Sequence, residues 1–398
     1  MTNPAPRPDA ALVPRLRPFT STIFAEMTAL ATSSGAINLG QGFPDEDGPR
    51  AMLDVARQAI ASGVNQYPPG PGTPELRAAI AAARLRDYGQ VFDPDSEVLV
   101  TVGATEAIAA AVLALADAGD EVLMLEPYYD SYPAVVAMAG AKTASVPLVR
   151  DAAGRFALDA DRLAAAVTDR TRLLLINSPH NPTGTVLTRA ELQVIADLAI
   201  SRNLTVVTDE VYEYLTFDDA RHTPIGTLPG MAERTLTISS AGKSFNVTGW
   251  KIGWVCGPAP LVAAVRAAKQ FLTFVGGAPF QPAVAYALLH EQAWVADLRD
   301  SLQRKRNALC DGLRAAGLDV SVPSGTYFVQ ADIRALGERD GMAFCRTLPA
   351  RAQVAAVPTQ VFYDDPTDGA HLVRFAFCKK DDVIARAAQR LASLGGVS

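Results

Sequence analysis

The chain has 398 residues, of which 49% are hydrophobic, and its 36 basic and 42 acidic side chains leave a formal net charge of −6. This length exceeds one small domain and predicts two. No basic cluster marks a nucleic-acid surface, and no stretch reaches the roughly 18 apolar residues of a membrane span. The first 18 residues lack the apolar segment of a signal peptide, and four scattered cysteines predict reduced thiols in a cytoplasmic protein.

Short apolar runs alternate with helical patterns between residues 45 and 289. The runs predict strands at 97–102, 121–125, 172–177, 204–208, 235–239 and 252–256, and the alanine-rich stretch 105–117 predicts the helix after the first strand. Strands that are apolar on both faces and separated by helices indicate a largely parallel sheet covered on two sides. We therefore expect a large α/β domain over residues 45–289.

The pattern changes after residue 290. A long charged helix is expected over 294–316, followed by short strands near 327–331 and 372–377. These elements predict a smaller α+β domain over residues 290–398. Residues 1–44 are expected to form an N-terminal arm and part of this smaller domain, because the segment 19–30 has helical spacing.

Two polar residues that could carry chemistry follow predicted strands. Lys243 stands in SSAGK after the strand 235–239, and Asp209 follows the apolar run LTVVT in TDEVYEY. Strand carboxyl ends are where α/β folds place their sites. A buried acid is costly without a partner, and a protonated pyridine nitrogen of a cofactor would be such a partner. Taken alone, Lys243 could be a solvated loop lysine and Asp209 a helix N-cap.

A possible phosphate site lies near these two residues. The small-residue turn 103–106 joins a strand to its helix, and such turns bind phosphate through backbone N–H groups and the helix dipole. Ser240 and Lys251 could add a hydroxyl and a cation to the same phosphate. Tyr212 would point its hydroxyl toward Asp209 if a helical turn begins there.

Asn181 and Arg374 are candidates for substrate binding. Asn181 lies in SPHNPTG, where two prolines make a rigid turn that fixes a polar side chain. Arg374 is flanked by apolar residues, and a buried arginine needs an anion such as a substrate carboxylate. An ordinary loop and a structural salt bridge are the alternatives for the two residues.

The motifs SPHNPTG, TDEVYE, SSAGK and GWKIGW occur in this order, and together they resemble the class I aminotransferases of fold type I, which use pyridoxal 5′-phosphate. The resemblance covers nearly the whole chain from about Arg15. NLGQGFPDEDGP and NQYPPGPG are similar to the kynurenine, glutamine and methionine aminotransferases. NQYPPGPG, VTVGATEAIAAAV and VGGAPFQPA are similar to the actinobacterial N-succinyldiaminopimelate aminotransferases.

The resemblance implies a role for each candidate and an aspartate aminotransferase-like fold. Lys243 would hold the cofactor as a Schiff base and shuttle the proton, Asp209 would pair with the pyridine nitrogen, and Tyr212 with the 3′ oxygen. The other implied cofactor contacts are Gly103, Ala104, Thr105, Ser240 and Lys251 at the phosphate, Asn181, Tyr128 stacked on the ring, and Tyr67 at the phosphate of the neighbouring subunit. The implied substrate contacts are Gly42, Phe24, Asn181 and Arg374, with Arg374 at the α-carboxylate. Tyr67 thus implies a homodimer.

Two departures from the family pattern bear on these roles. Lys251 stands where many members have arginine, so it would bind phosphate as a point charge. Gly276 and Gly277 stand where kynurenine aminotransferases of the animal type carry bulky side chains, which suggests room for a longer substrate. This favours N-succinyl-LL-2,6-diaminopimelate as amino donor, with glutamate and 2-oxoglutarate as the second pair.

Other functions share these motifs. Kynurenine, glutamine and methionine differ from the favoured donor only beyond Cβ, and carbon–sulfur β-lyases use the same lysine. Regulators built on this fold carry an additional N-terminal DNA-binding domain, which about 18 residues rich in proline and arginine cannot supply. The sequence therefore predicts an enzyme and leaves its amino donor open.

Overall fold

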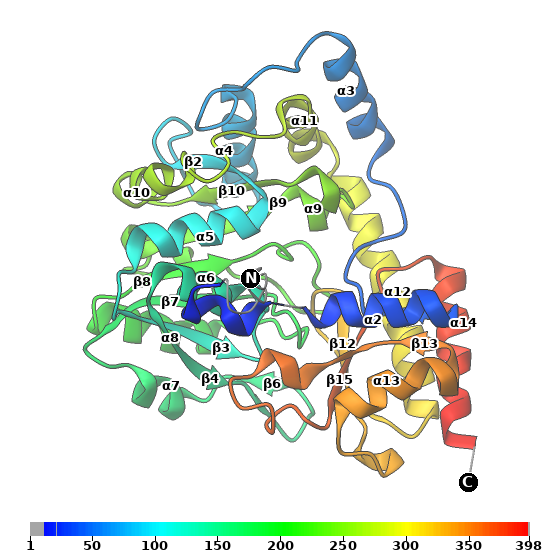
Figure 1. Ribbon diagram of the computed structural model, residues 1–398. Coiled ribbons are helices and arrows are strands. Elements are labelled where there is room, and N and C mark those ends of the chain that lie inside the picture. Colours follow the sequence, from blue (N-terminus) through cyan, green and yellow to red (C-terminus); the bar gives the residue numbers. More distant parts are fainter. Residues whose placement is uncertain (1–11, 21, 397–398) are drawn as a thin grey trace, which may run out of the picture.

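The computed structural model describes residues 12–20 and 22–396, which form two main sheets with helices packed around them (Figure 1). Residues 1–11, part of the arm expected from the sequence, lie outside the described ranges. The boundaries at residues 44 and 289 stay a prediction.

The large sheet has seven strands in the order β2-β10-β9-β8-β7-β3-β4. The strands are β2 (Val98–Val102), β3 (Glu121–Glu126), β4 (Lys142–Pro147), β7 (Thr171–Asn177), β8 (Thr205–Asp209), β9 (Thr235–Ser240) and β10 (Ile252–Cys256). Only β10 runs antiparallel to its neighbours, so the sheet is largely parallel, as expected. The strand β4 escaped prediction because it is an edge strand that is mostly half-buried.

Helices cover both faces of this sheet, and the apolar strands are buried between them. One face carries α5 (Gly103–Leu115), α6 (Ser131–Ala139) and α10 (Ala259–Lys269). The other face carries α7 (Ala160–Ala166) and α8 (Arg189–Ser201) over one half, and α3 (Arg50–Ala61), α4 (Pro74–Tyr88) and α11 (Gln281–His290) over the other. Burial on both faces explains why the strands appear in the sequence as continuous apolar runs.

The C-terminal part forms the expected smaller α+β unit. Its antiparallel sheet has the order β11-β12-β15-β14, with β11 (Asp319–Ser321), β12 (Phe328–Asp332), β14 (Val357–Pro358) and β15 (Leu372–Ala376). The helices α12 (Gln292–Ala315), α13 (Gly341–Ala352) and α14 (Asp381–Ala392) pack around it (Figure 1). The helix α2 (Ile23–Ser34) contacts α13, and β1 (Ile37–Asn38) pairs with β13 (Val354–Ala355), so N-terminal residues complete this unit.

Two general expectations can be compared with this fold. Within residues 12–20 and 22–396, no helix is long and apolar enough to cross a membrane. All four cysteines are buried and free, as predicted.

Candidate active site

The strand ends of the large sheet and the small unit enclose a cavity of about 300 Å³. All residues predicted for the site line this cavity except Tyr67 and Tyr128. The predicted residues that do line the cavity are Phe24, Gly42, Gly103, Ala104, Thr105, Asn181, Asp209, Tyr212, Ser240, Lys243, Lys251 and Arg374. Side chains from distant parts of the sequence therefore meet at one place.

One end of the cavity lies where β10 passes close to the start of α5. Gly103 opens α5 with a φ of +73°, and a Cβ on Gly253 would lie 2.5 Å from the carbonyl carbon of Gly103. The Nζ atom of Lys251 lies at the same place, 3.0 Å from the position that a Cβ on Gly103 would take. A helix N-terminus and an ammonium group carry charge of the same sign, so their convergence fits a bound anion such as phosphate.

Lys243 lies in α9 (Ala241–Ser244), a four-residue helix that begins directly after Ser240 at the end of β9. Its Nζ atom donates to the carbonyl oxygen of Gly42 over 3.4 Å. Burial lowers the pKa of Lys243 to about 8. The lowered pKa increases the neutral fraction of this amine, which a nucleophile or a base requires.

Asp209 is the last residue of β8 and is 5% exposed. Its Oδ2 accepts a hydrogen bond of 2.7 Å from the Tyr132 hydroxyl, and its Oδ1 accepts one of 3.2 Å from the Val211 N–H. Burial raises the pKa of Asp209 to about 6 despite both hydrogen bonds. No ion pair satisfies this carboxylate within the described residues, so a protonated ring nitrogen is a suitable partner.

Tyr212 lies in a hydrogen-bonded turn. The sequence allowed a helical turn at this position. The N–H of Glu213 donates to the carbonyl of Glu210, and the N–H of Leu215 donates to that of Tyr212, both over 2.8 Å. The Tyr212 ring packs edge-on against Tyr327 with 5.2 Å between centroids. Burial raises the pKa of Tyr212 above its usual value, so its hydroxyl stays protonated and available for hydrogen bonding.

Asn181 lies in the loop after β7, and its backbone and side chain are both fixed. Its N–H donates to Oδ1 of Asn177 over 2.7 Å, and its own Oδ1 accepts from Nη1 of Arg374 over 3.0 Å. His180 beside it is buried against the hydroxyl of Thr183, 2.8 Å away. Burial lowers the pKa of His180 to about 3, so this histidine is neutral and structural.

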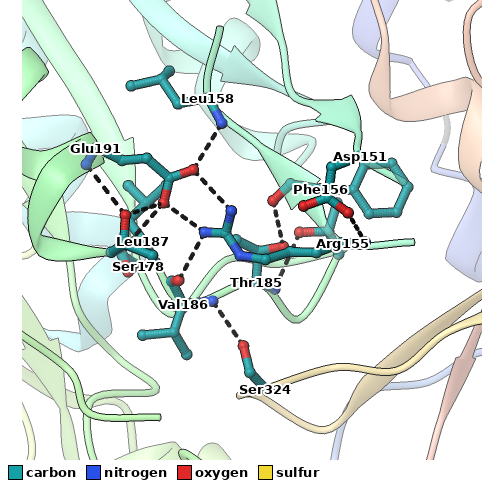
Figure 2. Close-up of polar contacts among 12 residues, drawn as sticks. Asp151, Arg155, Phe156, Leu158, Ser178, Thr185, Val186, Leu187, Glu191 and Ser324 are labelled. Atoms are coloured by element: carbon teal, nitrogen blue, oxygen red, sulfur yellow. Dashed lines mark hydrogen bonds and ion pairs between the residues drawn. The ribbon is translucent and has the colours of Figure 1, made fainter. Parts of the chain in front are cut away.

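A polar network holds the continuation of this loop, as Figure 2 shows. Arg155 donates to both carboxylate oxygens of Glu191 over 2.9 and 2.5 Å, and to the carbonyl of Val186 over 3.1 Å. The N–H of Val186 donates to Oγ of Ser324 in the C-terminal unit over 3.2 Å. Glu191 also completes the capping box of α8. The loop is thereby anchored to both units.

Arg374 reaches the cavity from β15. Its Nη2 atom donates to the carbonyl of Gly40 over 3.0 Å, while its buried Nε atom has no hydrogen-bond partner within the described residues. The guanidinium carbon lies 5.2, 4.0 and 5.3 Å from the ring centroids of Phe24, Phe328 and Phe362. Burial lowers the pKa of Arg374 to about 10. No carboxylate forms a salt bridge with Arg374 in the described chain, so the alternative interpretation, a structural salt bridge, is wrong.

The structure corrects the prediction for Tyr128. Its hydroxyl donates to Oδ1 of Asp364 over 2.7 Å and its N–H donates to the carbonyl of Phe362 over 2.9 Å, so it does not line the cavity. The next residue, Tyr129, lines the cavity in its place. The sequence prediction was wrong by one position, because contacts with the distant segment 362–364 decide which ring turns inward.

Tyr67 is 82% exposed and packs edge-on against Phe274, with 5.6 Å between ring centroids. Its expected role concerns a neighbouring subunit and stays a prediction.

Gly276 and Gly277 do not line the cavity within this chain. A Cβ on Gly276 would lie 2.7 Å from Cγ2 of Val102, and Gly277 has a φ of +62° that L side chains rarely adopt. Local packing and backbone conformation therefore account for both glycines.

The cavity lining also includes residues that were not predicted, among them Tyr129, Tyr132, Asn177 and Phe328. Asn177 is the polar last residue of a strand that was predicted correctly, a signal like the one that revealed Asp209. The side chain of Asn177 donates to the carbonyl of Asp209 over 2.8 Å and so supports the neighbouring strand end. Tyr132 and Phe328 gave no such signal, since their patterns are those of ordinary buried aromatic residues.

The fold and this cavity are those of an enzyme that transfers amino groups. The family model for aminotransferase class I and II matches residues 34–391. The chain belongs to this family and is a transaminase.

Particular relatives agree with the resemblance found in the sequence. The chain is 61% identical over 390 residues to the probable N-succinyldiaminopimelate aminotransferase DapC of Mycobacterium tuberculosis, with 96% of this chain and 98% of the relative covered. It is 39% identical to the methionine aminotransferase of Escherichia coli, with 94% and 96% covered. A solved structure of N-succinyldiaminopimelate aminotransferase from Mycobacterium tuberculosis has a TM-score of 0.95, 62% identity, and coverage of 96% of this chain and 100% of that one. The predicted fold class is confirmed.

Proposed function

We propose that this transaminase uses pyridoxal 5′-phosphate and takes N-succinyl-LL-2,6-diaminopimelate as amino donor, with 2-oxoglutarate as acceptor. The observation that carries the cofactor assignment is one cavity with three complementary groups. Lys243 supplies a buried amine for the aldehyde, Asp209 a buried carboxylate for the ring nitrogen, and Lys251 with the start of α5 a cationic place for the phosphate. Their chemistry fits the cofactor.

When bound, pyridoxal phosphate supplies an electron sink for the electron pair of the broken Cα–H bond. Asp209 would hold the proton on the ring nitrogen, and the hydroxyl of Tyr212 would hydrogen-bond the 3′ oxygen. The Nζ atom of Lys243 would accept the Cα proton, because burial lowers its pKa to about 8. Tyr129 takes the ring-packing role first expected of Tyr128.

Replacing Lys243 by alanine tests the cofactor assignment. We expect Lys243→Ala to lose transamination and the near-visible absorbance of the lysine-bound cofactor. Lys305→Met is a matched control, because Lys305 is also buried, pairs with Glu46 and does not line the cavity. Absorbance spectra and turnover of both variants are measured after incubation with pyridoxal phosphate; full turnover by Lys243→Ala contradicts the assignment.

Arg374 is proposed to bind the α-carboxylate of both substrates in turn. Its Nε atom has no hydrogen-bond partner among the described residues and aromatic rings surround its guanidinium, which leaves a desolvated donor for an anion. Charge-assisted hydrogen bonds are worth more than neutral ones, and lysine cannot reproduce the two-pronged geometry of arginine.

Arg374→Lys should therefore raise the KM for the amino donor and for the oxo acid alike, each by about tenfold for a loss near 1.4 kcal/mol. Steady-state kinetics with each substrate varied in turn measures both values. An increase for only one substrate contradicts a shared carboxylate site.

The succinylated donor is supported by the relative that is 61% identical over nearly the whole length of both chains. The methionine aminotransferase, at 39% identity, supports methionine less strongly as the alternative. The cavity itself explains binding of an α-amino acid and not of its distal part.

A half-reaction screen distinguishes these donors. The cofactor-loaded enzyme is mixed with N-succinyl-LL-2,6-diaminopimelate, methionine, glutamine or kynurenine, and the loss of near-visible absorbance is timed. The succinylated compound should react fastest at equal concentration. Faster reaction with another donor contradicts the substrate assignment but not the transaminase class, and pyruvate formed from a cysteine conjugate without an oxo acid reveals β-lyase activity.

A homodimer is the proposed active unit. Tyr67 and Phe271 are 82% and 85% exposed, and with Phe274 they present aromatic surface of the kind that subunit interfaces cover. Sedimentation should give twice the chain mass of 42.1 kDa, and a monomer contradicts the proposal.

The four buried free cysteines support a reducing compartment, for which we propose the cytoplasm.

A further inference from the structure

A second group of buried charges lies outside the cavity. Arg84 from α4 donates to Glu210 from Nη2 over 3.0 Å and to Glu213 from Nη1 over 2.7 Å. These three side chains are at most 2% exposed. The Nε atom of Arg84 donates to Gln90 over 3.0 Å, and its guanidinium lies 4.5 Å from the ring centroid of Tyr88. Every nitrogen of this guanidinium is therefore engaged.

The two carboxylates of this cluster belong to the turn that presents the site. Glu210 directly follows Asp209, and Glu213 directly follows Tyr212. The backbone of the same turn is closed by the hydrogen bond from Glu213 to Glu210. Arg84 in α4 thus binds Glu210 and Glu213 at the two ends of a turn whose other side chains line the cavity.

The cluster also reaches the strand that leads to Lys243. Ser239 donates from its hydroxyl to Oε1 of Glu213 over 2.6 Å and is followed by Ser240 at the cavity wall. The N–H of Glu210 donates to the carbonyl of Ile238 over 2.8 Å. The ends of β8 and β9 are therefore joined by a backbone hydrogen bond and by Glu213, whose carboxylate also pairs with Arg84.

Charge explains why this arrangement depends on Arg84. Two carboxylates are buried beside one guanidinium, with His222 3.0 Å from Glu210 as the other basic group. Burial works against the charge of Glu210, but Arg84 and His222 outweigh it and hold its pKa below the usual value. Burial raises the pKa of Glu213, against the effect of Arg84. Without Arg84, the turn would carry uncompensated buried charge next to Asp209.

We propose that Arg84 is a positioning residue for the cofactor: its paired contacts with Glu210 and Glu213 hold Asp209 and Tyr212 in place for the ring. The inference rests on the proposed use of pyridoxal phosphate. A merely structural role would lower the stability of the protein when Arg84 is replaced. A positioning role requires in addition that the replacement weakens cofactor binding and alters the orientation of the cofactor.

A matched control separates these two roles. Arg306 is another buried arginine: its side chain is 4% exposed, it pairs with Asp218 over 2.6 Å and it lies 5.2 Å from the ring centroid of Phe217. Neither Arg306 nor Asp218 lines the cavity. Arg306→Met therefore removes a buried arginine and its ion pair without touching the turn at 209–213.

The test compares the wild type with Arg84→Met, Arg84→Lys and Arg306→Met, each prepared without cofactor and titrated with pyridoxal phosphate. Three quantities are measured: the dissociation constant from the near-visible absorbance, the circular dichroism of the bound cofactor, and the melting temperature of the cofactor-free protein. In metal sites, removing a contact that supports a ligating side chain typically weakens affinity or activity about 10- to 100-fold, and we expect a loss of the same kind here.

We expect Arg84→Met to weaken cofactor affinity by at least about tenfold and to reduce its circular dichroism, with Arg84→Lys between it and the wild type. Arg306→Met should lower the melting temperature and leave affinity and dichroism unchanged. If Arg84→Met does not fold, the triple variant R84M/E210Q/E213Q, which removes both carboxylates together with the arginine, should fold and show the same loss of affinity.

Wild-type affinity and dichroism in the folded Arg84 variants, or an equal loss in Arg306→Met, would overturn the inference. Failure of the wild type itself to bind pyridoxal phosphate would overturn the proposed function instead.

Discussion

Burial of charge without full pairing is the constraint on which this structure depends. Lys243, Asp209 and Arg374 lie in one cavity, and burial moves their pKa values to about 8, about 6 and about 10. Each displacement corresponds to roughly 3 kcal/mol held against the charged form. Groups perturbed in this way cluster at functional sites, where a bound ligand can supply the missing partner.

The scaffold meets this constraint by drawing each group from a different element. Asp209 ends β8 and Lys243 follows the adjacent parallel strand β9, whereas Arg374 comes from the antiparallel sheet of the C-terminal unit. The close approach of β10 to α5, which Gly253 permits, brings Lys251 to the start of a helix. The charged residues are thus far apart in the sequence but close together in space. The site therefore forms only when the large sheet with its helices and the C-terminal unit are packed together.

The sequence was sufficient for features that depend on local chemistry. Strands buried on both faces appear as apolar runs, and polar residues such as Asp209 and Lys243 stand out directly after them. It failed where a distant contact decides. The choice between Tyr128 and Tyr129 depends on Asp364, and the glycine at 276 reflects the proximity of Val102. The ion pairs of Arg84 were equally hidden, because nothing in its helix points to residues 126 and 129 positions away.

The cavity defines the reaction more closely than it defines the substrate. Three polar side chains of its lining are already hydrogen-bonded within the protein: Asn177 donates to the carbonyl of Asp209, Asn181 accepts from Arg374, and Gln41 donates to Thr28. Few are left to recognise the distal part of an amino acid. Transfer of an amino group therefore follows from residues within this chain. The choice of donor depends on surfaces beyond Cβ, for which similarity over the whole chain is the stronger guide.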